Sequence, residues 1–183
     1  MSEEMLVCHC SPTLAGMKTG SLFSCAYRSQ EEMRKEIREL NQKLLKKGIR
    51  ILPVWMSTSR VLIYVYRPEK LMKDFSDEEV QKLLTCKGYN WNNSTECIYK
   101  LIQKLQDDPD FPHEIGLFLG YPVEDVKGFI ENGAACCKCS GCWKVYGDEQ
   151  AAMRLFIKYK KCREIYYQKW KSGVSVEQLT VAI

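Results

Sequence analysis

The chain has 183 residues, of which 45% are hydrophobic and 27% are charged. This composition is typical of a globular protein with enough apolar residues for a full core, and it excludes an intrinsically disordered chain. The net charge of +4 is mild, and the basic residues alternate with glutamates along stretches such as residues 30–47, which argues against a nucleic-acid partner.

The sequence also indicates where the protein works. Its first ten residues lack the basic segment and apolar run of a signal peptide, and no stretch reaches the roughly 18 apolar residues of a membrane helix. We therefore expect a cytoplasmic protein with no membrane partner. The ten cysteines are then expected to be free, metal-binding or redox-active, because the cytosol keeps thiols reduced. A thiol content this high also suits an anaerobic bacterium.

The N-terminal third is predicted to contain a helix and a β-hairpin. Residues 1–28 are rich in cysteine and punctuated by Gly, Ser and Thr, so we expect an irregular segment with short helical turns. Ser29 and Glu32 form a capping-box pattern for a helix that ends at Gly48. Residues 49–55 and 60–66 are rich in β-branched and aromatic residues, which predicts two strands joined as a hairpin.

Several helices are predicted after the hairpin. Pro68 starts one, Ser76 caps a second that reaches about Cys86, and residues 94–105 form a third. Pro112 and Pro122 each suit the first turn of a helix, which predicts two short helices over about 112–119 and 122–131. Three further elements are expected: a short third strand at 143–146, a long helix from Asp148 to about 171, and a helical turn within 175–182.

This order of elements predicts an α+β fold. We expect one domain with a small, partly antiparallel sheet of two to three strands and about six to eight surrounding helices. It is divided into the irregular segment (1–28), an α+β core (29–147) and a C-terminal helical part (148–183).

Residues 111–130, FPHEIGLFLGYPVEDVKGFI, have the highest density of special residues. On a helix over 112–119, His113, Gly116 and Gly120 would share one stripe, where the glycines allow a backbone or a ligand to approach closely. The positive helix end would favour a neutral imidazole at His113, which can serve as a base or a metal ligand. The alternative is a capping or core histidine, with glycines for tight packing and with Glu114 and Asp125 as first-turn acids.

A second candidate group lies near the N-terminus. Cys10 precedes Lys18, and Thr13 or Ser21 could cap a short helix there, so that a nearby cation and helix amides would lower the pKa of the thiol. Cys10 and His113 could then form a thiolate–imidazole pair. The sequence gives no distance between the two residues. The alternative is that this cysteine and this remote histidine have no functional relation.

A third group contains four thiols within seven residues: Cys136, Cys137, Cys139 and Cys142. Thiolates bind zinc and iron, so this cluster is a candidate metal site. Only Cys139 and Cys142 have the Cys-x-x-Cys spacing. A reduced, thiol-rich surface loop and a reversible disulfide between these two residues are the alternatives.

Three long motifs give the chain a family resemblance. They are Cys10-x-Pro-Thr-Leu-Ala-Gly-x-Lys18 with Ser21-Leu-Phe23, Pro112-His-Glu-Ile-Gly-x-Phe-Leu-Gly-Tyr-Pro122 with Asp125-Val and Gly128-Phe, and Trp143-Lys-Val-Tyr146. With these motifs the chain resembles an uncharacterised family of anaerobic Firmicutes, catalogued as domain of unknown function number 3793. The resemblance places Cys10, Lys18, His113 and Glu114 in the family pattern but not the cysteines of 136–142, and it suggests iron- or flavodoxin-linked physiology.

These observations lead to one main hypothesis and two alternatives. The main hypothesis is a pocket for a small-molecule ligand that joins the N-terminal segment to the 112–130 helix pair. In its catalytic form, an acyl-transfer or thiol-hydrolase activity, Cys10 is the nucleophile, His113 the base and Glu114 its orienter. The other expected ligand-binding residues are Lys18, Ser21, Gly116, Gly120, Tyr121 and Asp125. The alternatives are a zinc-, iron- or haem-binding partner of flavodoxin or another redox protein, and an interaction domain with purely structural motifs.

Overall fold

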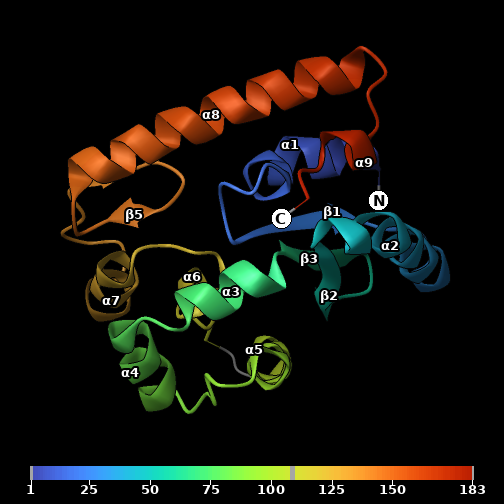
Figure 1. Cartoon of the computed structure of the whole chain (residues 1–183). Helices are drawn as coiled ribbons and strands as arrows, with labels where there is room; N and C mark the ends of the chain where they lie inside the picture. Colours follow the sequence, from blue (N-terminus) through green and yellow to red (C-terminus); the bar gives the residue numbers. More distant parts are fainter. Residues whose placement is uncertain (1, 108–109, 183) are drawn as a thin grey trace. The chain divides into compact units, whose positions relative to one another are not determined.

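The computed structural model describes residues 2–107 and 110–182. It confirms the α+β class, with a three-stranded antiparallel sheet, a two-stranded sheet and surrounding helices (Figure 1). The chain divides into two compact units. Unit 1 extends to Lys70 and resumes at Lys161, and unit 2 comprises Leu71–Lys160. Whether they form one domain, as the sequence suggests, stays a prediction.

The sheet of unit 1 has the strand order β1-β3-β2. Strands β2 (Arg50–Met56) and β3 (Arg60–Tyr66) form the predicted antiparallel hairpin, and β1 (Gly20–Ala26) pairs with the other edge of β3. The last residue of β3, Tyr66, therefore lies opposite Gly20 on one side and Arg50 on the other.

The expectation of an irregular segment over residues 1–28 is wrong. This segment forms helix α1 (Glu3–Leu14) as well as strand β1. Leu6, Cys10 and Leu14 recur every four residues and give α1 one buried face. The Ser, Thr, Gly and Pro residues between them obscured this periodicity, because they favour turns in isolation.

Helices α1, α2 (Gln30–Leu44) and α9 (Val176–Leu179) cover one face of the sheet. Strand residues such as Phe23, Ile51 and Ile63 point into this core, and Figure 1 shows α1 and α9 side by side. The 3₁₀ helix η1 (Leu45–Lys47) continues α2 and ends at Gly48, whose φ of 73° is the left-handed conformation that glycine tolerates.

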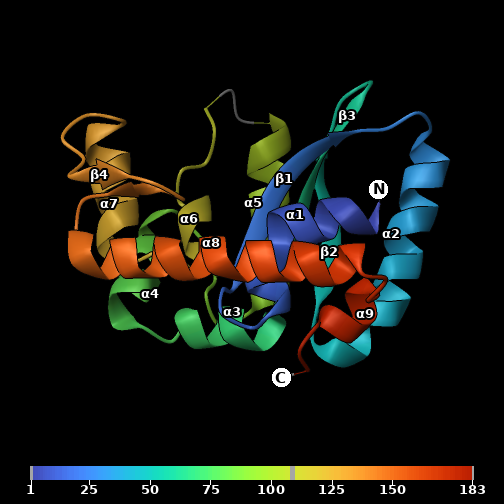
Figure 2. The ribbon, with the colours of Figure 1, turned by 90° about the horizontal axis from the view of Figure 1, so that it is seen from above.

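Unit 2 is built of short helices and a small hairpin. Its elements are the end of α3 (Pro68–Asp74), α4 (Glu78–Cys86), α5 (Ser94–Asp107), α6 (Ile115–Phe118), α7 (Val123–Asn132), β4 (Cys139–Ser140), β5 (Lys144–Val145) and the first half of α8 (Glu149–Lys171). The predicted third strand thus belongs to a separate sheet, which lies beside α7 (Figure 2). Within the described residues, none of the helices has both the length and the apolar character needed to cross a membrane.

Candidate functional site

The predicted pair of short helices exists, but its first member is shorter than expected. Helix α6 covers only Ile115–Phe118, so the predicted stripe of His113, Gly116 and Gly120 on one helix is not formed. The backbone N–H groups of Ile115, Gly116 and Leu117 donate to carbonyls three residues back, at 3.0–3.2 Å. This tighter 3₁₀-type winding replaces the first turn of an α-helix.

Two glycines determine how α6 meets α7. A Cβ atom on Gly116 would lie 2.7 Å from Val126 Cγ2, so only glycine lets the two helices pack this closely. Gly120 has a φ of 73° and ends α6 in the left-handed conformation. The chain can therefore turn sharply into Tyr121 and Pro122 and begin α7 at Val123.

Glu114 lies directly before α6 and is buried in an ion pair. Its Oε1 accepts hydrogen bonds from Lys104 Nζ at 2.5 Å and from the Tyr89 hydroxyl at 3.0 Å. Burial alone would raise the pKa of Glu114, but the hydrogen bond from Lys104 and the weaker interactions beside it lower the pKa below its ordinary value. The carboxylate thus fastens α6 to α5, and its predicted role as the orienter of His113 stays a prediction.

Asp125 has an equally complete set of partners. Its Oδ2 accepts from Trp143 Nε1 at 2.7 Å, and its Oδ1 accepts from the backbone N–H groups of Tyr146 and Gly147 at 2.7 and 2.8 Å. The side chain is 3% exposed. Asp125 therefore holds the β4–β5 hairpin against α7, which is a structural role; a ligand-binding role for it stays a prediction.

His113 is exposed on the surface of unit 2. Its ring meets the ring of Phe129 edge to face, at a centroid distance of 4.8 Å, and it is tilted against Phe111 at 6.1 Å. The imidazole thus sits on an aromatic surface, and the role of general base stays a prediction.

The N-terminal candidates come together in unit 1. Ser21 is hydrogen-bonded to the Cys10 thiol and Lys18 acts on it through its charge, and each of these two interactions lowers the pKa of the thiol. Ser21 Oγ is also 2.9 Å from Thr13 Oγ1. Burial outweighs both neighbours, however, and raises the pKa of Cys10 to about 12. The group is a neutral thiol at neutral pH, and its action as a nucleophile, which stays a prediction, would require the thiol to be uncovered.

Cys10, Lys18 and Ser21 belong to unit 1, whereas His113 and Gly120 belong to unit 2. The pocket that the sequence predicts from both segments therefore stays a prediction, and so does the thiolate–imidazole pair.

The four clustered cysteines lie on and around the β4–β5 hairpin. Cys139 is in β4, Cys142 is exposed in the following turn, and Cys136 is exposed with a φ of 57°. Burial and the negative charge of Glu149 raise the pKa of Cys139. Over residues 2–107 and 110–182, no group of three or more His, Cys, Asp or Glu side chains is arranged to hold a metal ion. The zinc or iron site stays a prediction.

A groove of about 550 Å³ lies within unit 2, where the α3–α4 connection faces the α6–α7 turn. Gly120 and Tyr121, two of the predicted ligand-binding residues, line it. The other lining residues are Lys73, Asp74, Ser76, Asp77, Val80, Leu117, Pro122, Val123 and Glu124. Glu79 on α4 accepts a hydrogen bond from Lys127 on α7 at 2.6 Å, which joins the two walls. We call this cavity the α4–α7 groove.

The acidic residues of this groove were not recognised from the sequence as a possible site. The prediction that Ser76 caps α4 is wrong, because the cap is Asp77, whose Oδ1 accepts from the backbone N–H groups of Glu79 and Val80. Glu124 resembled an ordinary first-turn acid of α7. The sequence did contain a signal for these acids. Asp74 and Asp77 are three residues apart, and each lies at a helix boundary, so the short connection between α3 and α4 carries two carboxylates.

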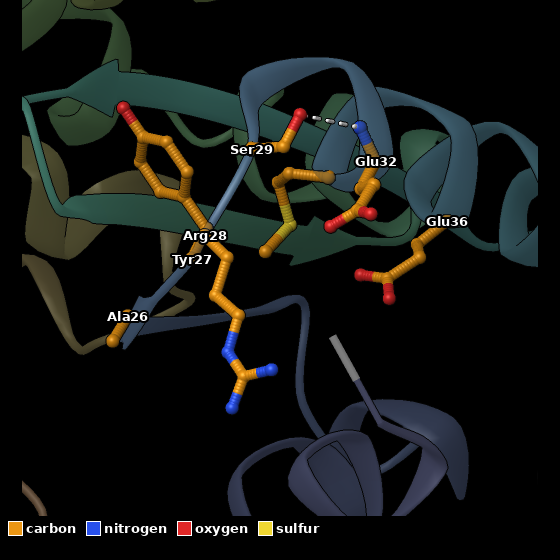
Figure 3. Close-up of a pocket in the computed structure, with 7 residues that line it drawn as sticks. Ala26, Tyr27, Arg28, Ser29, Glu32 and Glu36 are labelled. Atoms are coloured by element: carbon orange, nitrogen blue, oxygen red, sulfur yellow. Dashed lines mark hydrogen bonds between the residues drawn. The ribbon is translucent and has the colours of Figure 1, made fainter.

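A second hollow, of about 430 Å³, lies in unit 1 where β1 leads into α2. Figure 3 shows Arg28, Glu32 and Glu36 along it, with the Tyr27 ring turned to another side. Ser29 Oγ accepts from the Glu32 backbone N–H at 3.4 Å, which is the predicted helix cap. None of the residues predicted to bind a ligand lines this hollow, which mixes a cation with acids at the start of a helix.

Comparisons with known proteins give one match. Neither the curated proteins nor the solved structures yielded a match to this chain. The model of one family, described as "Protein of unknown function (DUF3793)", matches residues 6–180, which is nearly the whole chain. The chain therefore belongs to this DUF3793 family, as its three motifs suggested.

Proposed function

We propose that this protein binds a small organic cation, an amine or guanidine with an apolar stem, in the α4–α7 groove. The observation that carries the proposal is the composition of that groove. Among the described residues that line it, the carboxylates of Asp77 and Glu124, with that of Asp74 beside them, outnumber the one cation, Lys73. Such an excess of one charge in a concave site attracts a ligand of opposite charge.

The apolar part of the groove supports a ligand with a hydrocarbon body. Val80, Leu117, Pro122 and Val123 line it together with Tyr121. Ligand sites commonly combine such apolar walls with a few polar groups that fix the orientation of the ligand. The volume of about 550 Å³ lies within the roughly 300–1,000 Å³ that is usual for small-molecule sites.

Tyr121 is held in place by the residues behind it. Its ring stacks on Trp143 at a centroid distance of 4.7 Å, and its hydroxyl donates to the Cys142 carbonyl at 3.4 Å. Trp143 in turn donates to the buried Asp125 carboxylate. This chain of contacts keeps the Tyr121 ring rigid, and a rigid wall reduces the entropy lost on binding.

Binding accounts for the site better than covalent catalysis does. The described residues that line the groove include neither a cysteine nor a histidine. They include one serine, Ser76, and its hydroxyl donates a hydrogen bond to the Lys73 carbonyl at 2.6 Å. Elsewhere, Cys10 is buried as a neutral thiol and Glu114 is paired with Lys104. A nucleophile with an adjacent base is the usual requirement for acyl transfer.

The proposal is tested by titrating phenethylamine into the full-length protein and following backbone amide shifts by NMR. We expect saturable shifts at Gly120 and Val123, and none with 2-phenylethanol, which has the same body without the charge. Glu124→Gln should weaken amine binding about fivefold, since one exposed charge contributes up to about 1 kcal/mol. Glu131→Gln is the matched control, because Glu131 is exposed on the same helix but does not line the groove.

Two results would count against the groove as a cation site. In the first, phenethylamine and 2-phenylethanol shift the same amides equally, because the carboxylates would then contribute nothing to binding. The other is an equal loss of affinity in Glu124→Gln and Glu131→Gln, because the attraction would then come from the whole surface of the helix.

A further inference from the structure

Arg67 follows strand β3 and is 2% exposed, yet its bonds all go to neutral groups. Its Nε donates to the Thr13 carbonyl and its Nη2 to the carbonyls of Leu14 and Val181, each at 2.7 Å, and Nη1 donates to the Lys47 carbonyl at 3.0 Å. These bonds use four of the five N–H groups of a guanidinium. One N–H on Nη1 therefore has no acceptor among the bonds that the structure gives for Arg67.

The positive charge of Arg67 is not removed by its burial. Burial lowers the pKa of Arg67, but a guanidinium stays protonated in proteins at neutral pH. The four carbonyl oxygens hold the guanidinium rigidly. It is therefore a fixed cation, and one N–H group on Nη1 takes no part in these four hydrogen bonds.

A cavity of about 220 Å³ lies in unit 1 beside this group. Arg67 lines it together with two further cations, Arg50 at the start of β2 and Lys70 in α3, and Glu69 is the one acid among the described residues of the lining. Arg50 is exposed and Lys70 is half-buried, so the cations extend from the interior to the mouth of the cavity. Gly48 adds a wall without a side chain.

We propose that this cavity, the Arg67 pocket, binds a phosphate group, either as inorganic phosphate or as the phosphate of a small monoester. Three cations against one carboxylate leave an excess of two positive charges, which matches a phosphate dianion. Arginine donors fit phosphate oxygens in geometry as well as in charge. The pocket is smaller than the roughly 300–1,000 Å³ of sites for drug-sized ligands, so it suits a phosphate with a short carbon body rather than a nucleotide.

The charge balance of unit 1 as a whole also favours an anionic ligand. Unit 1 has 16 Lys and Arg residues against nine Asp and Glu residues, whereas unit 2 has 11 against 14. The potential around unit 1 therefore attracts anions toward the mouth of the pocket, at a rate that falls as the salt concentration rises.

The test is a titration of the full-length protein with sodium phosphate and, separately, with glycerol 3-phosphate, at constant ionic strength set by sodium chloride. We expect saturable amide shifts at Gly48 and Lys70 with one or both ligands. Tighter binding of the monoester identifies an organic phosphate as the occupant, and equal binding identifies the free anion. The groove in unit 2 has no part in this result, so the two proposals stand or fail separately.

Substitutions separate a built pocket from general attraction. Because Arg67 variants risk unfolding unit 1, the variants are Arg50→Gln and Lys70→Gln, each expected to weaken phosphate binding about tenfold. Lys46→Gln is the control, because Lys46 is an exposed cation of η1 that does not line the pocket. The proposal is overturned by an equal loss in Lys46→Gln, or by no saturable shift at up to about 10 mM of either ligand.

Discussion

The thiol of Cys10 is fully buried, and its ionisation is therefore linked to the folding of unit 1. Burial raises its pKa from 9.0 to about 12, whereas the unfolded chain ionises near 9. The stabilising effect of the neutral thiol is thus complete below pH 9 and is lost as the pH rises toward 12. We expect this group to lower the free energy of unfolding by up to about 1.4 kcal/mol per pH unit above pH 9.

Urea unfolding at pH 8, 9 and 10 measures this dependence. Other thiols and tyrosines titrate in the same range, so the quantity to compare is the difference between the wild-type protein and Cys10→Ala. That difference should shrink as the pH rises from 9 to 10. If the free energies of unfolding of the wild-type protein and Cys10→Ala instead change with pH in parallel, the thiol is accessible to water in the folded chain. Cys10 would then again be a candidate nucleophile.

At the residue scale, the sequence was informative where chemistry is local. Gly120 and Tyr121 were singled out from their motif alone, and both line the α4–α7 groove, although their binding of a ligand stays a prediction. The roles of Glu114 and Asp125 could not be predicted, because their partners Lys104 and Trp143 lie 10 and 18 positions away and meet them only through tertiary packing. Arg67 gave no signal at all, since its acceptors are backbone carbonyls that any residue could supply.

Helices α6 and α7 depend on the absence of a side chain at Gly116. In Gly116→Ala the new Cβ would lie 2.7 Å from Val126 Cγ2 and 3.2 Å from Tyr121 Cδ2. Alanine favours a helix by up to about 1 kcal/mol, but the overlap outweighs this gain, and we expect a net destabilisation of about 1–3 kcal/mol. Thermal or urea unfolding measures the loss.

A double mutant shows whether this overlap is the cause. In Gly116→Ala/Val126→Ala the Cγ2 atom is absent, so the double mutant should be no less stable than Val126→Ala alone. If the two destabilisations simply add, Gly116 is needed for a reason other than its contact with Val126.

Elements with caps of their own were predictable, and elements defined by distant partners were not. Ser29 and Asp148 each cap the helix that the sequence assigned to them, with their side-chain oxygens accepting from backbone N–H groups three residues on. Strand β1 went unrecognised, because its Gly and Ser residues become a strand only by pairing with β3. Local propensity is weak evidence for such a strand.

At the scale of the whole molecule, the charges are unequally divided. Unit 1 carries the basic excess and the Arg67 pocket, and unit 2 carries the acidic excess and the α4–α7 groove. The two proposed ligands have the charges that these units attract, although each proposal rests on the lining residues of its own cavity.

The C-terminal segment is an integral part of unit 1, because it completes a core that begins 170 residues earlier. Val176 and Leu179 are buried against α1, and Val181 exchanges hydrogen bonds with Arg67 and Leu14. A truncation after Ser175 removes all three. Burial of each apolar side chain contributes about 1.5–3 kcal/mol, so unit 1 should lose about 3 kcal/mol or more of stability.

Hydrogen exchange followed by mass spectrometry locates this loss. Amides of β3 in unit 1 should exchange roughly a hundredfold faster in the truncated chain, because they exchange through unfolding of that unit. Amides of α5 in unit 2 should accelerate far less, and the full-length variant Glu177→Ala, altered at an exposed position of α9, should leave both unchanged. Equal acceleration of β3 and α5 would mean that the units unfold together, as the single domain that the sequence predicts, because a loss of stability in one cooperative unit reaches every amide within it.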